Sequence, residues 1–276
     1  MPGRVAATAR LSRAENAMPI AKLRSLLDHP LTKGLDLDDP KTTELRVRII
    51  REKVFLRRIY DEWYRTICAA IPAGEGAVLE LGSGAGYFQE FVPEAIQSEV
   101  FACSNAHLVA DARSLPFRDG SLKAIAMTNV LHHIPDIEQF LREAARCLRK
   151  GGRILMVEPW VSGWSRLIYT TLHHEPFVPE AGEWKIPDSG PLSSANGALP
   201  WMVFERDRAR FEKEFAEFRI VEIRPWNPFR YLVSGGVSMK TLVPTGSYGA
   251  WEALEGLLEP WMGKLAMFAF LAVERS

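Results

Sequence analysis

Short apolar runs and amphipathic segments alternate along the middle of this chain. The apolar runs have the length of buried strands, and the amphipathic segments repeat apolar residues every three or four positions, as helices do. This alternation predicts a parallel sheet with helices on both faces. The expected strands are Ala77–Leu81, Glu99–Cys103, Leu108–Ala112, Ala124–Thr128 and Arg153–Val157, and the expected helices are Tyr87–Ile96 and Ile137–Leu148, the second ended by Gly151 and Gly152.

The segment before this alternation has a helical pattern. Between Pro40 and Pro72, apolar residues recur at spacings of three, four and seven, and basic residues lie along the same helix. Such a charge run is typical of a solvated face, and a phosphate-bearing or membrane-surface partner is the alternative. We expect residues 1–72 to form an N-terminal tail and helical lid segment and residues 73–276 to form one ligand-binding domain.

The segment after the alternation has a different amino-acid composition. Residues 159–204 are rich in Pro, Gly, Ser and aromatic residues and are interpreted as a variable insertion on the substrate side. A further insertion is expected at 225–263, with a helix at 249–258. The remaining expected elements are a helix at Asp207–Phe218 capped by Asp207, and strands at Arg219–Arg224 and Leu265–Glu274.

Composition narrows the class of protein. Lys and Arg number 34, as do Asp and Glu, so no surplus of positive charge exists for binding nucleic acid by bulk electrostatics. The three cysteines match no zinc-site spacing and cannot all pair, which favours a reducing, cytoplasmic location. No apolar run reaches the ~20 residues that span a bilayer. Residues 1–18 lack the apolar region of a secretory signal and are expected to be a loose tail.

The first expected strand runs into a glycine-rich turn at 82–86, GSGAG. A turn of this kind lets backbone approach a ligand closely. Dinucleotide-binding sheets prefer G-x-G-x-x-G, whose third glycine lets helix and strand pack under a pyrophosphate. Here the pattern is G-x-G-x-G followed by Tyr87, which weakens the dinucleotide interpretation.

Four stretches in order resemble the class I S-adenosylmethionine-dependent methyltransferases, specifically the type 11 group that acts on small molecules. They are Val78–Phe88, Ala110–Leu122, Thr128–Ile134 and Leu148–Pro159. The resemblance covers residues 77–160 and is specific for cofactor and fold. It implies an α/β fold with a doubly wound, mostly parallel, seven-stranded Rossmann-like methyltransferase sheet, and S-adenosyl-L-methionine as the cofactor.

The resemblance also implies which residues hold the cofactor. Glu80 matches the acid that supports the glycine loop and, through water, the ammonium group of the cofactor. Asp111 and Ala112 match the step that receives the adenine amino group, and the backbone at Asn129 matches a position beside the methionine end. The loop residues matched to the methionine and ribose parts are Gly82, Ser83, Gly84 and Gly86.

The ribose-binding acid departs from the family's pattern. The family normally has an acid at the end of the second strand, but Cys103, Ser104 and Asn105 stand where this strand is expected to end. An earlier end makes Glu99 that acid, and we assign Glu99 to the ribose hydroxyls. Only about a dozen residues then remain before Asp111, too few for a helical crossover. A Glu facing water at the sheet edge is the alternative.

Two histidines are the candidates for catalysis. A base is needed only if the methyl acceptor arrives protonated. His132 and His133 follow the fourth strand, at the edge where open α/β sheets bind ligands. Successive helical residues point about 100° apart, so at most one is expected to face the acceptor, and His133 is preferred. The alternative is that both histidines cap or pack the strand end.

The residues after the fifth strand are candidates for the acceptor side. Glu158 is a candidate to orient a substrate hydroxyl, or else a carboxylate bonded to loop backbone. His173-His174-Glu175 is a second acid–base candidate, where no third ligand has the spacing of a metal site, so no metal is expected. The tentative pocket residues are Glu158, Trp160, Trp164, His174 and Trp201.

Seven of the eight tryptophans follow residue 159, and other aromatic residues join them there. One interpretation is a lid that encloses an apolar or ring-containing substrate. A satellite core that holds the insertion together is the competing interpretation. A third interpretation is a surface that lies on a membrane and admits a lipid-linked acceptor.

The expected function is a cytoplasmic methyltransferase that uses S-adenosylmethionine and methylates a small or lipid-linked molecule at O, N or C. Peripheral contact with a membrane is kept as an alternative, and no nucleic-acid partner is expected. An NAD(P)-dependent oxidoreductase is the first alternative, opposed by the glycine spacing and by the Asp111–Phe117 block. A non-catalytic module that keeps the cofactor fold is the second, opposed by the intact loop glycines and Asp111.

Overall fold

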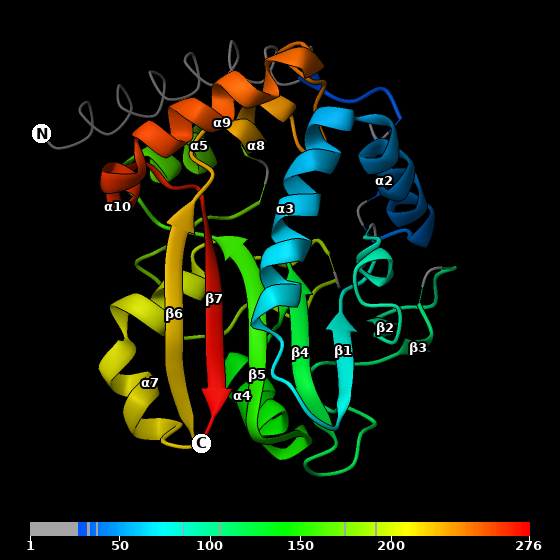
Figure 1. The fold of residues 1–276 in the computed structure, drawn as a ribbon, viewed down its shortest axis with the longest axis vertical. Helices are drawn as coiled ribbons and strands as arrows, with labels where there is room; N and C mark the ends of the chain where they lie inside the picture. The colour runs from blue at the N-terminus through cyan, green and yellow to red at the C-terminus, as the bar shows by residue number, and fades with distance from the viewer. Residues whose placement is uncertain are drawn as a thin grey trace, which may run out of the picture.

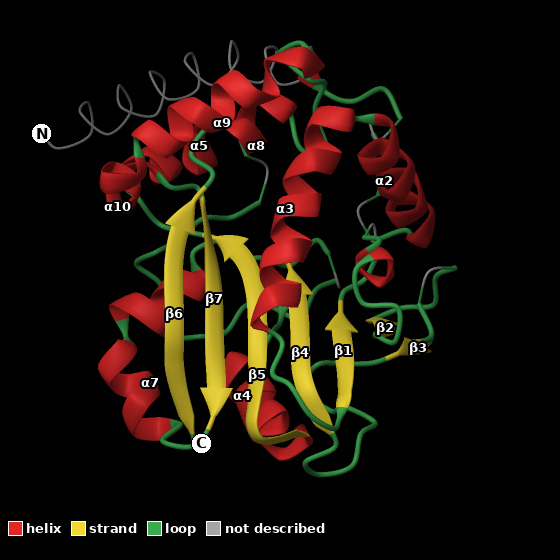
Figure 2. Ribbon diagram, viewed as in Figure 1, coloured by secondary structure: helices red, strands yellow, loops and turns green. Residues whose placement is uncertain are grey.

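A seven-stranded sheet forms the centre of the computed structural model, which describes residues 27–31, 34–36, 38–84, 86–104, 106–173, 175–190 and 192–276. The strand order is β3-β2-β1-β4-β5-β7-β6 (Figure 2). β7 is antiparallel to both neighbours, and the other pairs are parallel. The predicted doubly wound, mostly parallel sheet is confirmed. The strands are β1 (Ala77–Leu81), β2 (Ile96–Glu99), β3 (Leu108–Val109), β4 (Leu122–Thr128), β5 (Leu148–Pro159), β6 (Phe218–Trp226) and β7 (Phe268–Arg275).

The central strands are buried on both faces. Six consecutive residues of β7, from Phe268 to Val273, are buried, as are the last six of β5, from Ile154 to Pro159. Continuous apolar runs of this kind are typical of strands covered by helices on both sides. Figure 1 shows α3 (Val54–Ala70) in front of the sheet and α4 (Ile137–Cys147) behind it, both packed on β5.

The connection from β1 to β2 differs from the sequence prediction. Its described residues form only a short 3-10 turn, η1 (Phe88–Glu90), so the predicted helix at Tyr87–Ile96 is wrong. α3 covers this part of the sheet instead, with the ring of Tyr64 5.1 Å from that of Tyr87 and 5.4 Å from that of Phe88. Because an amphipathic helix from elsewhere in the chain already buries this face, a crossover helix is not needed there.

The predicted helical segment before the sheet is divided in two. α2 (Pro40–Glu52) and α3 are separated at Lys53, whose backbone (φ −85°, ψ 84°) leaves the helical region. The ammonium group of Lys53 donates to the carbonyl oxygens of Gly236 and Met239, at 2.6 and 2.8 Å. This long-range contact accompanies a break that the helical pattern alone does not indicate. The expected tail at 1–18 lies outside the described residues.

Two other local predictions are corrected. α4 ends at Cys147, and Gly151 and Gly152 lie inside β5 rather than ending the helix. The predicted helix at Asp207–Phe218 is shorter, at Arg208–Glu214 (α7); Asp207 is its N-cap residue, but its side chain makes no capping hydrogen bond. The Asp207 carboxylate instead accepts from Nε1 of Trp184, at 2.8 Å. The contact with Trp184 therefore uses the Asp207 carboxylate, which local rules would assign to capping the helix.

The segments after β5 and β6 place helices above the carboxyl ends of the parallel strands (Figure 1). These are α5 (Gly163–Thr171), α8 (Arg230–Ser234), α9 (Tyr248–Leu257) and α10 (Met262–Leu265). The shorter turns are η2 (Leu131–His133), α6 (Leu199–Trp201), the π-helix η3 (Met202–Arg206), η4 (Thr245–Ser247) and η5 (Glu259–Trp261). None of the helices in the described part of the chain has both the length and the hydrophobicity needed to cross a membrane.

A buried ionic cluster joins three of these helices. Nε of Arg230, in α8, lies 2.5 Å from the carboxylate of Glu255 in α9, and Nη1 lies 2.9 Å from that of Glu62 in α3. The other oxygen of Glu255 accepts from the backbone N–H groups of Phe229 and Arg230. A buried charge without its partner is costly, so the position of α8 and α9 over α3 depends on this arginine.

Replacing Arg230 with Met should therefore destabilise the protein by about 3–5 kcal/mol, because it leaves the buried Glu255 carboxylate without its counter-charge. The exposed pair Arg48–Glu52 supplies the matched control, and Arg48→Met should cost less than about 1 kcal/mol. Denaturant unfolding of both variants measures the difference. Equal losses in the two variants would contradict the assignment.

Candidate functional site

A cavity of about 440 Å³ opens at the carboxyl edge of the parallel strands. Open α/β sheets bind ligands at this edge because the loops that follow the strands converge there. The cavity has two ends with different chemistry. One is lined by the turns after β1, β2 and β3, and the other by the β4 loop together with residues of the segment after β5.

The glycine turn after β1 forms one wall of the first end. Gly82 has φ 65°, and a Cβ atom there would overlap a methyl group of Val130, from the β4 loop. A Cβ atom at Gly84 would lie 2.6 Å from Oε1 of Glu99. Both glycines line the cavity, so the absence of side chains lets two neighbouring loops pack against this turn.

The other two predicted loop residues, Ser83 and Gly86, pack against neighbouring protein segments and not against the cavity. The Ser83 N–H donates to the carbonyl oxygen of Ser98 at 3.0 Å, and its side chain is buried. A Cβ atom at Gly86 would overlap the hydroxyl of Tyr64 in α3. Neither residue is among those that line the cavity.

Glu99 is the last residue of β2 and lines the cavity, as the earlier strand end requires. Its Oε1 accepts from the Gly84 N–H at 3.0 Å, and its Oε2 accepts from the Val100 N–H at 2.9 Å. Burial raises the pKa of this carboxyl, and these two backbone donors work in the opposite direction. The alternative of a Glu facing water is contradicted, because the side chain is buried.

Glu80 lies behind the glycine turn, in the middle of the sheet. Its carboxyl group accepts from Nε2 of Gln97 at 3.1 Å and is hydrogen-bonded by Ser83. Burial raises the pKa of Glu80 to about 7, although both hydrogen bonds lower it. The group therefore changes charge close to neutral pH, at a position from which it supports the cavity wall.

Asp111 and Ala112 line the cavity just after β3. The carboxylate of Asp111 binds the guanidinium of Arg113 through both oxygens, at 2.8 to 3.1 Å, and Arg113 also binds Asp188 at 2.8 Å. Hydrogen bonds from Arg113 lower the pKa of Asp111. A carboxylate has about four lone-pair sites, so this pairing leaves room for a ligand donor.

Asn129 marks the boundary between the two ends. It follows β4 with φ 58°, a left-handed conformation that Asn tolerates better than most residues. Its N–H donates to the carbonyl oxygen of Val157, and its side chain hydrogen-bonds Tyr60 of α3. Asn129 and Tyr60 both line the cavity.

The carboxylate of Glu158, at the end of β5, holds the loop that carries the histidines. Its Oε1 accepts from the N–H groups of Val130 and Leu131, both at 2.8 Å, and its Oε2 lies 2.7 Å from Nδ1 of His132. The side chain is fully buried. Glu158 is not among the residues that line the cavity, and its contacts are those of a carboxylate bonded to loop backbone.

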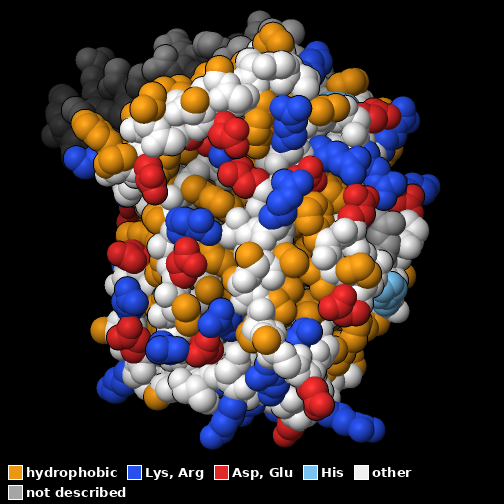
Figure 3. All heavy atoms as spheres, in the orientation of Figure 1, with side chains coloured by type: hydrophobic (Ala, Val, Ile, Leu, Met, Phe, Trp, Pro, Cys, Tyr) orange, Lys and Arg blue, Asp and Glu red, His pale blue; other side chains and the backbone are white. Residues whose placement is uncertain are grey.

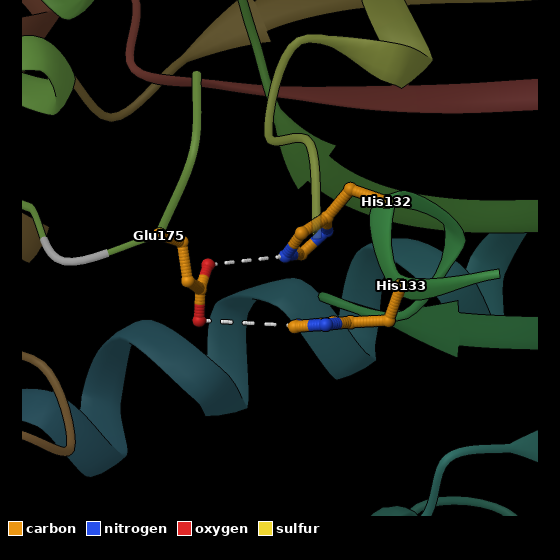
Figure 4. Close-up of side chains that lie close together, drawn as sticks. All are labelled: His132, His133 and Glu175. Carbon is orange, nitrogen blue, oxygen red and sulfur yellow. Dashed lines mark ion pairs between the residues drawn. The ribbon is translucent and has the colours of Figure 1, made fainter. Parts of the chain in front are cut away.

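Both histidines line the second end of the cavity, together with Glu175 (Figure 4). Nε2 of His132 lies 3.6 Å from the Glu175 carboxylate, and Nε2 of His133 lies 3.9 Å from it. Both histidines therefore reach the cavity, and which of them faces the acceptor stays a prediction. The two residues lie in a 3-10 turn, not an α-helix, and their rings are 4.2 Å apart.

The three groups of this cluster shift one another's pKa in opposite directions. Burial lowers the pKa of His132, but hydrogen bonds to Glu158 and Glu175 outweigh burial and raise it. Burial and the neighbouring His132 lower the pKa of His133. Burial raises the pKa of Glu175, but the adjacent histidines, including His173, hold it well below its usual range.

The predicted tryptophans lie away from this cavity. Trp160 and Trp201 line a second, smaller cavity between β6 and the α6–α7 region. Nε1 of Trp164 donates to the carbonyl oxygen of Pro228 at 2.9 Å, and this residue lines neither cavity. These aromatic side chains hold the segments after β5 together, as the satellite-core interpretation expects. His174 lies outside the described residues.

Several cavity residues have no signal in the sequence motifs. Thr43, Arg46 and Tyr60 reach the cavity from α2 and α3, which the sequence suggested only as a lid and a charged face. Thr43 and Arg46 are three residues apart, a spacing that puts them on one face of a helix. The aromatic lining residues from the later segments are Tyr169, Phe177, Tyr231 and Phe268.

Residues 79–156 match the family model described as a methyltransferase domain. Over 47 residues the chain is 45% identical to 27-O-demethylrifamycin SV methyltransferase of Amycolatopsis mediterranei, a stretch that covers 17% of each protein. Over 103 residues it is 31% identical to the uncharacterized methyltransferase YcgJ of Bacillus subtilis, covering 30% of this chain and 41% of that protein. The chain thus spans less than half the length of these curated relatives.

Among solved structures, geranyl diphosphate C-methyltransferase of Streptomyces coelicolor A3(2) superposes with a TM-score of 0.50. That crystal structure holds Mg²⁺, geranyl-S-thiolodiphosphate and S-adenosyl-L-homocysteine. The superposition covers 94% of this chain and 92% of the other, at 14% identity. At this identity the likeness shows the fold alone.

The buried carboxyl of Glu80 should make stability depend on pH. Its pKa is about 7 in the folded state and 4.5 ordinarily, so between these pH values the folded state holds the extra proton and stability falls as pH rises. The loss is about 3 kcal/mol for a shift of this size. Denaturant unfolding at pH 5 and pH 8 should show a smaller loss in Glu80→Gln than in the wild type.

The exposed Glu94 supplies the matched control, and Glu94→Gln should retain the wild-type pH dependence. If Glu80→Gln also retains it, the proton is not held at Glu80.

Proposed function

We propose that this chain, whose residues 79–156 form a class I methyltransferase domain, transfers the methyl group of S-adenosylmethionine to a small molecule. The observation that carries the proposal is the continuity of one cavity. Gly82, Gly84 and Glu99 line one end of it, and His132 and His133 line the other. A donor and an acceptor bound at the two ends would lie in the same enclosed space, which methyl transfer requires.

The first end offers the groups that this cofactor needs. The Glu99 carboxylate would accept from the ribose hydroxyls, and the Asp111 carboxylate from the adenine amino group. The backbone at Asn129 and the glycine turn would lie along the methionine part, with Glu80 behind them. When bound, S-adenosylmethionine supplies a methyl group on a positively charged sulfur, and the protein's work is to orient the acceptor and exclude water.

The second end favours an acceptor with an apolar body. Tyr169 and Phe177 stack with ring centroids 4.8 Å apart, and Tyr231 packs edge-on against Phe268 at 4.6 Å. All four line the cavity. Aromatic walls with a few convergent polar groups are typical of pockets for small organic molecules. Substrate enclosure is therefore assigned to these rings and not to the tryptophans.

The polar groups at this end favour an acceptor oxygen over nitrogen or carbon. The imidazoles of His132 and His133 and the Glu175 carboxylate face one another across the acceptor end. A hydroxyl can donate its hydrogen to such a cluster while its lone pair is directed to the methyl group. We infer O-methylation of a hydroxyl on a ring-containing or otherwise apolar molecule.

A lipid-linked acceptor is the second substrate class. Leu257 of α9 and Trp261 of η5 are 80% and 58% exposed, on helices above the carboxyl edge of the sheet. Figure 3 shows Lys and Arg side chains gathered over α2 and the upper turns of α3. Exposed apolar side chains near basic ones are typical of surfaces that lie on membranes.

Isothermal titration calorimetry with the full chain tests the cofactor assignment. S-adenosylmethionine and S-adenosylhomocysteine should bind, and NAD should not. Glu99→Ala should weaken S-adenosylhomocysteine binding by about 10- to 100-fold, since hydrogen bonds to a charged group are worth about 1.5–3 kcal/mol. Glu99→Gln, which keeps an acceptor for the Gly84 N–H, should fall between Ala and the wild type.

Glu94→Gln is again the control for an exposed acid near the same loop and should bind as the wild type does. Tight binding of NAD with no binding of S-adenosylmethionine would overturn this proposal in favour of an NAD(P)-dependent oxidoreductase. Methyl incorporation into phenolic or lipid hydroxyls, from labelled S-adenosylmethionine, separates the two acceptor classes, and cofactor binding without turnover on either would favour the non-catalytic module.

A further inference from the structure

The acceptor end of the cavity contains a group of three side chains with metal-binding atoms. Nε2 of His132, Nε2 of His133 and the carboxylate of Glu175 converge there, and one ligand atom from each lies within 4.8 Å of the others (Figure 4). The spacing of residues 173–175 gave no third ligand on its own. The fold supplies it, because the two histidines come from the β4 loop and Glu175 from the segment after β5.

The orientation of each histidine ring is fixed by a hydrogen bond at Nδ1, the ring nitrogen that does not face Glu175. Nδ1 of His132 lies 2.7 Å from the Glu158 carboxylate, and Nδ1 of His133 lies 2.9 Å from the carbonyl oxygen of Ser194. A carbonyl or carboxylate oxygen only accepts, so both Nδ1 atoms carry hydrogen and donate. This arrangement directs Nε2 into the cavity, and it is the arrangement that metal-binding histidines almost always have.

The distances suit closure around an ion. Ligand atoms at about 2.1 Å from a tetrahedral metal lie about 3.4 Å from one another. The Glu175 oxygens lie 3.6 Å from Nε2 of His132 and 3.9 Å from Nε2 of His133. Glu175 lies in a loop that follows α5, so small shifts of its side chain and of the two imidazoles can bring the three ligand atoms, which lie within 4.8 Å of one another, to this spacing. His173, whose Nδ1 lies 3.8 Å from Glu175, borders the same site.

The donor set indicates the class of metal. Two imidazoles and one carboxylate bind Zn²⁺ in catalytic sites and Fe²⁺ in facial triads, in both cases with positions left open for water or substrate. Mg²⁺ and Ca²⁺ prefer sites built from oxygen alone. The open positions here would face the cavity that all three residues line.

We propose that His132, His133 and Glu175 bind a divalent transition-metal ion of the Zn²⁺ and Fe²⁺ class at the acceptor end of the cavity. Glu158 and the Ser194 carbonyl are the positioning groups for the two histidines. Metal binding by the three side chains does not require that the protein be a methyltransferase. Its role does rest on the proposed function: the ion would hold the acceptor oxygen and make its hydroxyl more acidic.

Direct metal binding tests the proposal with the full chain. After treatment with a chelator, Zn²⁺ titrated by calorimetry should bind with one ion per chain, and Co²⁺ should give the visible absorption of an ion held by nitrogen and oxygen ligands. His133→Ala and Glu175→Gln should each weaken Zn²⁺ binding at least about 100-fold. Glu158→Gln should weaken it about 10- to 100-fold, as loss of an orienting partner does.

His107→Ala is the matched control, because His107 is exposed and lies outside this cluster, and it should bind Zn²⁺ as the wild type does. Circular dichroism and S-adenosylhomocysteine binding, measured on every variant, show that the fold and the cofactor end are intact. Stoichiometric Zn²⁺ binding that folded His133→Ala and Glu175→Gln both lose supports the site. Absence of stoichiometric binding in the wild type, or binding that survives in both folded variants, overturns it.

The two proposals fail separately. A chain that binds S-adenosylhomocysteine but not Zn²⁺ leaves the methyltransferase proposal standing and makes the cluster an acid–base group without metal. A chain that binds Zn²⁺ at these residues but not S-adenosylhomocysteine retains the metal site and loses the methyltransferase proposal.

Discussion

The carboxylate of Glu158 has no exposed surface, and the geometry of the cavity depends on what it binds. Its two oxygens accept from the N–H groups of Val130 and Leu131 and contact Nδ1 of His132. A buried carboxylate that loses such partners costs several kcal/mol, so the β4 loop has one stable position relative to β5. Val130 in turn packs against Gly82, where a side chain would overlap it. One buried charge therefore links the end of β5, the histidine turn and the glycine turn.

The two ends of the cavity are built in different ways. The first end consists of strand ends and the turns directly after them, whose positions the parallel sheet determines. Gly84 and Glu99 lie on neighbouring strand ends and are joined by one hydrogen bond of 3.0 Å. α2 reaches the first end, where Thr43 lies beside Gly84, whereas the second end combines the β4 loop with residues that follow β5. Its shape depends on long-range packing, such as the contact of Lys53 with Gly236.

This difference explains what the sequence could predict. Most of the strands and the glycine turn follow from local signals: apolar runs and glycines that allow close approach. The second strand is the exception, because it is expected at Glu99–Cys103 and lies at Ile96–Glu99, the earlier range that makes Glu99 the acid at its end. The missing crossover helix after β1 could not be predicted, because it depends on α3, whose Tyr64 covers that face. The pairing of Glu175 with the histidines joins segments about forty residues apart, and no spacing rule reaches across a loop of that length. The tryptophans were misplaced because aromatic composition does not distinguish a cavity wall from a core.

The separation of the two ends has a physical consequence for specificity. Substituting an aromatic residue at the acceptor end, such as Phe177 or Tyr231, changes the wall that encloses the acceptor but touches none of the backbone turns at the first end. The β4 loop is different, because Val130 and His132 belong to the same short turn and share the Glu158 carboxylate. A change there moves both ends together. The acceptor class can therefore vary through the segments after β5, while the β4 loop and Glu158 are constrained by both binding functions at once.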